Sequence, residues 1–296
     1  MAVLQPAAPG RRAMTSEERN YLLLQRARSV IKHAVLIIFG IAFMLPFVWM
    51  ISSSVKPNID IFEIPIRLIP KSLRLENYVD ATNAIPFWQY LWNSTYYTIF
   101  ATIGAVLSNT FIAYGFARVR WRGRNVLFII VIATMMLPFQ VRMIPLYILF
   151  ARIGWLNSFL PLIVPNFFGN AFYIFLMRQF MMTLPKELDD AARIDGASEW
   201  GIFWRVAVPL SKPAILTVAI FEIIHTWHDF IGPLVYLRHP TKYTLSIGLR
   251  LYFTQYGAEW GLLMAAAAMF TIPMVIFFFF AQRSFIEGIT LTGLKG

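Results

Sequence analysis

Long uncharged stretches alternate with short charged ones along the chain, and this pattern indicates the class of protein. A helix needs about 17–25 mostly apolar residues to cross a bilayer. Five stretches without internal charge reach this length, and a sixth is apolar apart from two carboxylates and two histidines. The six predicted spans are residues 34–55, 81–118, 125–141, 153–177, 213–237 and 260–282. We therefore expect an all-α, polytopic integral membrane protein with six transmembrane helices.

Composition supports this interpretation. Of the 296 residues, 58% are hydrophobic and only 14% are charged, against about 25% charged residues in an ordinary soluble domain. A soluble core of this size could not bury so much apolar surface. The chain contains no cysteine, which excludes disulfide frameworks, thiolate metal sites and cysteine nucleophiles.

The net charge of +11 reflects where the basic residues fall along the chain. If both termini lie on the cytoplasmic side, the inner segments hold 17 of the 26 lysines and arginines, and four of these crowd into residues 118–124. Basic residues collect on the cytoplasmic side of membrane proteins, so we expect both termini to be cytoplasmic. No basic run is longer than the enrichment of basic residues on the cytoplasmic side explains. Binding to nucleic acid is therefore not expected.

The same pattern divides the chain into segments. They are a cytoplasmic N-terminal tail at residues 1–33, a first transmembrane helix at 34–55, an extracytoplasmic loop at 56–89, a five-helix core at 90–283 and a cytoplasmic C-terminal tail at 284–296. Residues 1–12 lack the apolar segment of a cleaved signal peptide, so the first span is expected to serve as an uncleaved insertion signal.

Residues 185–213, within the core, are expected to form a cytoplasmic loop of a helix, a glycine turn and a second helix. Carboxylates crowd the start of the first helix, where they favour the positive end of the helix dipole. Asp195 and Gly196 end that helix, because glycine adopts positive φ without a steric clash. Ser198 is placed to cap the second helix, which Pro209 is expected to end. The loop would be a compact knob on the cytoplasmic face.

The sequence of this knob resembles the EAA loop of ABC-importer permeases. Asp190, Ala191 and Ala192 are followed three residues later by Gly196, and then by Val-Ala-Val-Pro at residues 206–209. The family pattern is Glu-Ala-Ala, three residues, Gly, and a downstream Ile-x-Leu-Pro. Asp190 departs from that pattern by one methylene, which keeps the charge but shortens its reach, and the two valines keep the apolar character.

The flanking sequence resembles the carbohydrate branch of this family, the maltose-type (MalG-like) permeases, over about residues 46–296. The matching segments are residues 77–78, 86–87, 93–94, 135–138, 178–180, 184–185, 187–188 and 282–296. The resemblance implies a type I ABC importer permease in a bacterial or archaeal cell (inner) membrane. Its solute would be a sugar or oligosaccharide, with glycerol phosphate as an alternative within the same family.

The resemblance also implies partners. They are a second permease subunit in a heterodimer, two ATPase subunits, an extracytoplasmic sugar-binding protein and the membrane lipids. The sequence holds no Gly-x-x-x-x-Gly-Lys-Ser/Thr motif, the loop that cradles ATP phosphates. We therefore expect no cofactor in this chain and no enzymatic activity of its own, with ATP and Mg²⁺ held by the partner ATPases.

The residues expected to couple to the ATPase lie in the knob and in the C-terminal tail. In the knob they are Asp190, Ala191, Ala192, Asp195, Gly196 and Ala197. In the tail they are Gly288, Gly293 and Lys295, although a frayed terminus would explain the tail equally well. Elsewhere, Gly40, Gly104, Gly115 and Gly169 are predicted to be isolated points of close helix packing.

The fifth predicted span carries polar residues at membrane depth, where charged groups usually face a cavity or a partner. Glu222, His225 and Asp229 have the i, i+3, i+7 spacing of one helical face, and His228 points elsewhere. Glu222, Trp227, His228 and Asp229 are candidates for a translocation path, with Trp227 stacking on a sugar ring and Asp229 accepting hydroxyl hydrogen bonds. A polar contact between subunits is the alternative.

Three further interpretations are weaker. His225 and His228 lack a third ligand at a recognisable spacing, so no metal site is expected. A membrane-embedded enzyme acting on lipid-linked substrates would need clustered carboxylates or phosphate clamps at one membrane face, and only the knob has an acidic cluster. A structural scaffold would need none of the polar residues in the fifth span.

Overall fold

The computed structural model describes residues 16–254 and 257–293, and it is all-α as predicted. Within these residues, β1 (Phe253–Thr254) and β2 (Gly257–Ala258) form one short antiparallel ladder. The α-helices are α1 (Ser16–Ser54), α2 (Asn58–Ile61), α3 (Glu76–Ala84), α4 (Phe87–Ala117), α5 (Arg124–Ala133), α6 (Phe139–Arg152), α7 (Leu160–Ile163), α8 (Ala171–Thr183), α9 (Glu187–Ile194), α10 (Glu199–Ile202), α11 (Val208–Leu210), α12 (Lys212–His228), α13 (Ile231–Tyr236), α14 (Leu245–Gly248) and α15 (Trp260–Gly293). Short 3₁₀ segments are η1 (Thr134–Met136), η2 (Val164–Phe168), η4 (Pro240–Lys242) and η5 (Leu249–Tyr252), and η3 (Phe203–Ala207) is a π-helix.

Six membrane spans can be built from the described helices. Four segments are long and apolar enough to cross a membrane unaided: Leu23–Ser54, Phe87–Ala117, Leu160–Thr183 and Trp260–Gln282. Two bent pairs supply the others, Arg124–Met136 with Phe139–Arg152 at 99° and Glu199–Leu210 with Lys212–His228 at 74°. The predicted number of spans is reached when each bent pair is counted as one span.

The third predicted span, residues 125–141, is broken near its end. The chain bends between η1 and α6, where Leu137 takes an extended conformation just before Pro138. A residue that precedes proline is pushed out of the helical region by the proline ring, so this helix ends there. The fourth span begins at Leu160 rather than at residue 153, because Gly154 and Asn157 have positive φ.

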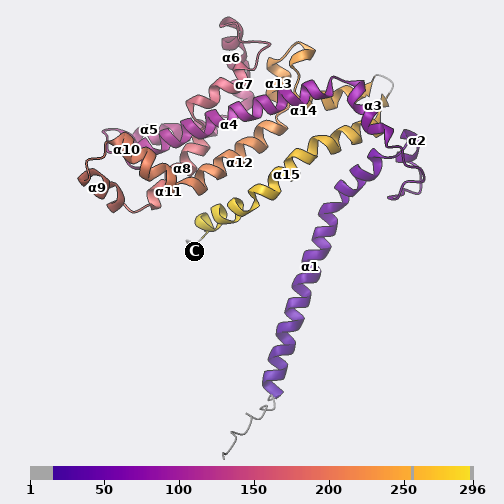
Figure 1. Cartoon of the computed structure of the whole chain (residues 1–296), viewed down its shortest axis with the longest axis horizontal. Helices are drawn as coiled ribbons and strands as arrows, with labels where there is room; N and C mark the ends of the chain where they lie inside the picture. The colour runs from indigo at the N-terminus through magenta and orange to yellow at the C-terminus, as the bar shows by residue number, and fades with distance from the viewer. Residues whose placement is uncertain (1–15, 255–256, 294–296) are drawn as a thin grey trace, which may run out of the picture.

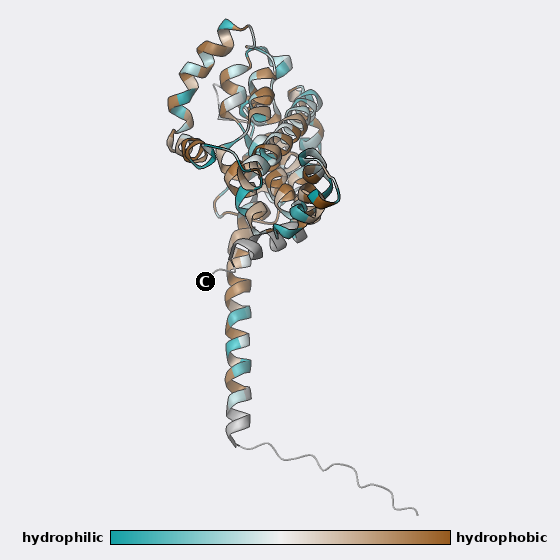
Figure 2. Cartoon of the chain, turned by 90° about the vertical axis from the view of Figure 1, so that its left-hand side faces the viewer, coloured by the Kyte–Doolittle hydropathy of each residue, from teal (hydrophilic) through white to brown (hydrophobic). Residues whose placement is uncertain are grey.

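Helices also run into both predicted tails. α1 begins at Ser16, inside the segment expected to be a tail, and α15 continues past residue 283 to Gly293. Figure 2 shows α1 projecting from the rest of the molecule. Its apolar span has no buried share in this single chain, and it contacts the body through α15.

The body is built around α4. Figure 1 shows α4, α12 and α15 running side by side, with α9 and α10 at one end and α2 and α3 at the other. At the first end, Tyr114 of α4 packs with Met177, Ile202 and Phe203 in a buried cluster. At the other end, residues near the start of α4 pack with α14 and α15. One helix therefore positions residues at both ends of the body.

Of the four glycines predicted to be points of close packing, two are. A Cβ atom on Gly104 would lie 2.6 Å from the Phe167 ring, and one on Gly169 would lie 2.7 Å from Ile112. Gly40 and Gly115 have no other residue within 4 Å of that position, so for these two the prediction is wrong in the single chain.

Candidate functional site

The knob has the predicted helix, glycine turn and second helix. α9 ends at Ile194, and Gly196 has a φ of +80°, the left-handed conformation that glycine takes without strain. The Ser198 hydroxyl then accepts a hydrogen bond of 3.2 Å from the Gly201 amide and caps α10. These local features follow directly from the sequence.

The second helix ends at Leu210, one residue after the predicted end at Pro209. After α10 the chain continues as the π-helix η3 and then as α11, and Pro209 lies in the first turn of α11. The chain turns at the buried Ser211, and α12 follows at a sharp angle.

The coupling residues predicted in the knob are divided between two faces. Asp190, Ala191, Asp195 and Gly196 are exposed, whereas Ala192 and Ala197 pack inward against the buried cluster around Tyr114. At the end of α9, the Ile194 side chain is 87% exposed.

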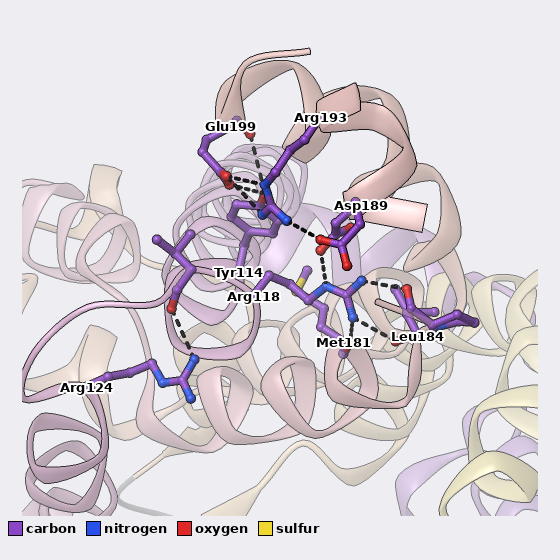
Figure 3. A network of polar contacts seen from close by, with 11 residues as sticks. Tyr114, Arg118, Arg124, Met181, Leu184, Asp189, Arg193 and Glu199 are labelled. Atoms are coloured by element: carbon purple, nitrogen blue, oxygen red, sulfur yellow. Dashed lines mark hydrogen bonds and ion pairs between the residues drawn. The ribbon is translucent and has the colours of Figure 1, made fainter. Parts of the chain in front are cut away.

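A buried ion pair attaches the knob to the end of α4. Arg118, which directly follows α4, donates from Nε to Asp189 Oδ2 over 2.7 Å (Figure 3). The two side chains are only 3% and 6% exposed. The same guanidinium donates to three backbone carbonyls, those of Met181 (3.3 Å), Leu184 (2.7 Å) and Pro185 (2.8 Å). It therefore joins the ends of α4 and α8 to the first turn of α9.

A second, more exposed network holds α10. Tyr114 of α4 donates to Glu199 Oε2 over 3.1 Å, and Arg193 of α9 pairs with both Asp190 and Glu199 (Figure 3). The hydrogen bond with Glu199 raises the pKa of Arg193 above its ordinary value, so the guanidinium stays charged. Exposed pairs of this kind contribute about 0–1 kcal/mol. The predicted coupling residue Asp190 thus has a partner within the knob.

The polar residues of the fifth span do not share one helical face, because α12 ends at His228. Asp229 is the residue after the helix and is extended, with φ −62° and ψ 115°. Its Oδ2 accepts from the Tyr97 hydroxyl at 3.0 Å, and its Oδ1 accepts from the Gly232 amide at 3.0 Å. Asp229 therefore anchors α13 and α4 to the end of α12.

The other candidates near Asp229 differ in exposure. Glu222 is 2% exposed, and its Oε1 has no hydrogen-bond partner among the described residues. Trp227 is 6% exposed and stacks on Phe270, to whose carbonyl its indole donates over 3.2 Å. His225 and His228 are exposed, and the described part of the chain contains no group of three residues able to hold a metal ion.

Trp227 also lines a cavity of about 320 Å³ between α4, α12 and α15. Three threonines of α4 line the same cavity: Thr95, Thr98 and Thr102. The hydroxyls of Thr98 and Thr102 have no hydrogen-bond partner among the described residues. Both hydroxyl oxygens are buried behind the cavity wall, which is almost entirely apolar.

The predicted tail residues lie at the edge of the described structure. Gly288 and Gly293 are part of α15, and Lys295 lies outside the described residues. Sequence reasoning missed Arg118, Asp189 and Tyr97. Arg118 was interpreted only as a topology signal, and the single hint for Asp189 was its place in the first turn of a helix.

A sequence profile of the family described as binding-protein-dependent transport system inner membrane component matches residues 109–290. This stretch includes both the knob and the polar end of α12. The chain belongs to this family. It is a permease subunit of an ABC importer, a transport component that works with a second permease, with separate ATPase subunits and with a binding protein. The resemblance read from the knob is thereby confirmed.

Individual relatives match nearly the whole chain. The arabinooligosaccharides transport system permease protein AraQ of Halalkalibacterium halodurans is 35% identical over 269 residues, which cover 88% of this chain and 96% of the relative. The diacetylchitobiose uptake system permease protein DasC of Streptomyces coelicolor is 31% identical over 270 residues, with 89% and 95% coverage.

Solved structures share the fold. A chain of a bacterial ABC transporter involved in the import of the acidic polysaccharide alginate superposes with a TM-score of 0.77 at 24% identity, covering 92% of this chain and 99% of that one. A chain of the alginate transporter in complex with a periplasmic protein bound to an alginate pentasaccharide has a TM-score of 0.59 at 14% identity.

Proposed function

We propose that this permease moves a sugar or oligosaccharide into the cytoplasm. The observation that supports this most directly is that the chain is 35% identical, over 96% of the relative's length, to a permease named for arabinooligosaccharides. A second relative is named for diacetylchitobiose. The charge distribution supports an orientation with both termini on the cytoplasmic side of the inner membrane.

The knob is the proposed contact with the ATPase. Its exposed tip, formed by Asp190, Ala191, Asp195 and Gly196 with Ile194 beside them, offers one apolar side chain among charged and small residues. Ile194 would enter a groove of the ATPase, and ATP and Mg²⁺ would be bound by that partner. Gly288, Gly293 and Lys295, at the end of α15 and beyond it, are proposed to reach the same partner.

The cavity beside Trp227 is proposed to lie on the path of the solute. Sugars bind to proteins through aromatic faces and hydrogen-bonding groups. Trp227 lines this cavity, and Asp229 follows two residues later, directly after the end of α12. Asp229 uses each carboxylate oxygen once within the chain. A carboxylate has about four acceptor positions, so capacity for sugar hydroxyls remains. His228 is exposed beside it, and Glu222 is buried two turns earlier in α12.

Uptake into proteoliposomes tests this function. The complete transporter (this chain, its partner permease, the ATPase and the binding protein) is reconstituted with ATP inside the vesicles. We expect vanadate-sensitive uptake of a labelled oligosaccharide from a panel that includes arabinooligosaccharides and diacetylchitobiose. Glycerol phosphate serves as the competing solute. Uptake of glycerol phosphate alone, or uptake by this chain without ATP hydrolysis, would contradict the proposal.

A further inference from the structure

α4 is attached at both ends to parts of the protein with different proposed roles. Near its beginning, Tyr97 holds Asp229 at the polar end of α12. Directly after its end, Arg118 holds Asp189 in the knob. At a rise of about 1.5 Å per residue, these two attachment points lie about 30 Å apart along one helix. The helix between them contains no proline and is continuous.

The attachment at the knob is unusually rigid for a single side chain. A guanidinium has five N–H donors in a planar fork, and Arg118 directs them to four acceptors: the Asp189 carboxylate and the carbonyls of Met181, Leu184 and Pro185. Because the fork is planar, the acceptors cannot shift independently without losing hydrogen bonds. The end of α8, the first turn of α9 and the end of α4 are therefore held as one unit.

A second attachment lies one helical turn earlier on the same face of α4. Tyr114, four residues before Arg118, donates to Glu199 at the start of α10. Arg193 links that carboxylate back to α9. Both helices of the knob are thus attached to α4, α9 through Arg118 and α10 through Tyr114. Any displacement of the knob relative to the membrane must move the end of α4 or break these contacts.

We propose that Arg118 is the positioning residue that passes movement of the knob to α4, and that α4 carries this movement as a rigid rod to Tyr97 and Asp229. The inference rests on the proposed role of the knob in ATPase coupling. The buried position of the pair matters, because water cannot substitute for the lost contacts when the knob moves. α9 is joined to α8 only through the non-helical residues 184–186, whereas α10 continues through η3 and α11 as one helix whose Ile202 and Phe203 pack against Tyr114 of α4.

The test compares Arg118→Met with Arg120→Met in the complete, reconstituted transporter. Arg120 is a nearby exposed arginine, so its substitution removes the same charge without the four contacts. For Arg118→Met we expect solute uptake to fall at least tenfold while ATP hydrolysis falls much less, so that more ATP is consumed per solute. Arg118→Lys should recover part of the loss, and Arg120→Met should match the wild type.

A merely structural role gives a different result. In that case uptake and hydrolysis of Arg118→Met fall together, in proportion to the amount of assembled complex, and the inference is wrong. If Arg118→Met does not assemble, Asp189→Asn replaces it, because the amide keeps the shape and one acceptor but loses the charge. An unchanged ratio of ATP to solute in assembled Asp189→Asn would also overturn the inference.

The rod itself is tested by combining Tyr97→Phe with Arg118→Lys. Two independent sites about 30 Å apart should have additive effects, whereas a connecting rod makes the effects non-additive. We expect the double variant to consume little more ATP per solute than the worse single variant. Strictly additive effects of the two substitutions would overturn the proposal that α4 acts as a rigid rod. Failure of wild-type saccharide uptake would instead count against the proposed function, so the two failures are distinguishable.

Discussion

The ring of Phe167 lies against Gly104 of α4 and leaves no room for a side chain between them. A Cβ atom on Gly104 would come within 2.6 Å of two ring carbons. The contact brings η2 directly onto the middle of α4. The close approach of these two segments therefore depends on the absence of a side chain at this position.

Gly104→Ala is expected to destabilise the chain by about 1–3 kcal/mol, because the Phe167 ring must move away from α4 to make room for the added methyl group. Gly115→Ala on the same helix is the control. Its Cβ would meet nothing within 4 Å, so it should be neutral or stabilise the helix by about 0.5–1 kcal/mol. Melting temperatures of the purified chain in detergent distinguish the two. Equal shifts for both variants would contradict the proposed contact.

Asn77 closes the junction between α1 and the segment that follows it. It is 2% exposed, and its Nδ2 donates to the carbonyls of Ser54 (3.0 Å) and Lys56 (2.8 Å). Asn77→Ala leaves two carbonyls without their donor, so we expect a loss of about 1–3 kcal/mol in the free energy of unfolding. Asn83→Ala, at an exposed position of the same helix α3, should have little effect. A melting temperature for Asn77→Ala equal to that of Asn83→Ala would refute the closing role.

Sequence patterns predicted those features of the fold that depend only on residues adjacent to one another in the chain. Gly196 and Ser198 were identified correctly because a positive φ and a helix cap need only one or two residues of suitable chemistry. The class of fold followed from the apolar stretches. Pro138 and Pro145 mark residues 137–155 as irregular, but they do not predict how sharply the chain bends there. Proline is tolerated in membrane helices when neighbours satisfy the free carbonyl, so its presence alone does not decide between a kink and a break.

Long-range contacts could not be read from the sequence. Asp189 and Asp190 are adjacent carboxylates in one first turn, yet only Asp189 is buried, because Arg118 reaches it from a helix 71 residues away. Likewise, Gly104 and Gly115 lie in the same helix, and the residues that flank them in the sequence are similar in character. Only the position of Phe167 in three dimensions makes one of them a point of close packing.

Backbone conformation at Gly196 gives a test of the knob. A Cβ at Gly196 would meet nothing within 4 Å, so a substitution there acts only through the φ of +80°. Alanine in this region is strained by about 1–2 kcal/mol, and asparagine by less. We expect Gly196→Ala to weaken binding of the ATPase about tenfold and Gly196→Asn to weaken it less, as measured by titrating the ATPase onto the permease pair.

Gly123 provides a matched control for Gly196. It also has a positive φ, +87°, with nothing within 4 Å of a Cβ, and it lies outside the knob. Gly123→Ala therefore introduces comparable backbone strain without changing the proposed contact. The knob would lose its assignment as the docking element if Gly123→Ala and Gly196→Ala weakened ATPase binding equally.

Asp229→Asn separates the charge of this side chain from its shape. The amide can still accept from the Gly232 amide and can donate to the Tyr97 oxygen, so both observed contacts have a replacement. We expect the complex to assemble normally. A hydrogen bond to a charged acceptor contributes about 1.5–3 kcal/mol, so loss of the charge should raise the KM for saccharide uptake about tenfold or more.

Asp80→Asn is the control for this experiment, because Asp80 is an exposed carboxylate paired with Arg74 outside the membrane-spanning helices. Its KM should equal that of the wild type. If Asp229→Asn fails to assemble, and that failure accounts for the loss of uptake, Asp229 acts only as the anchor between α4, α12 and α13. An assembled Asp229→Asn transporter with an unchanged KM would likewise remove this carboxylate from the solute path.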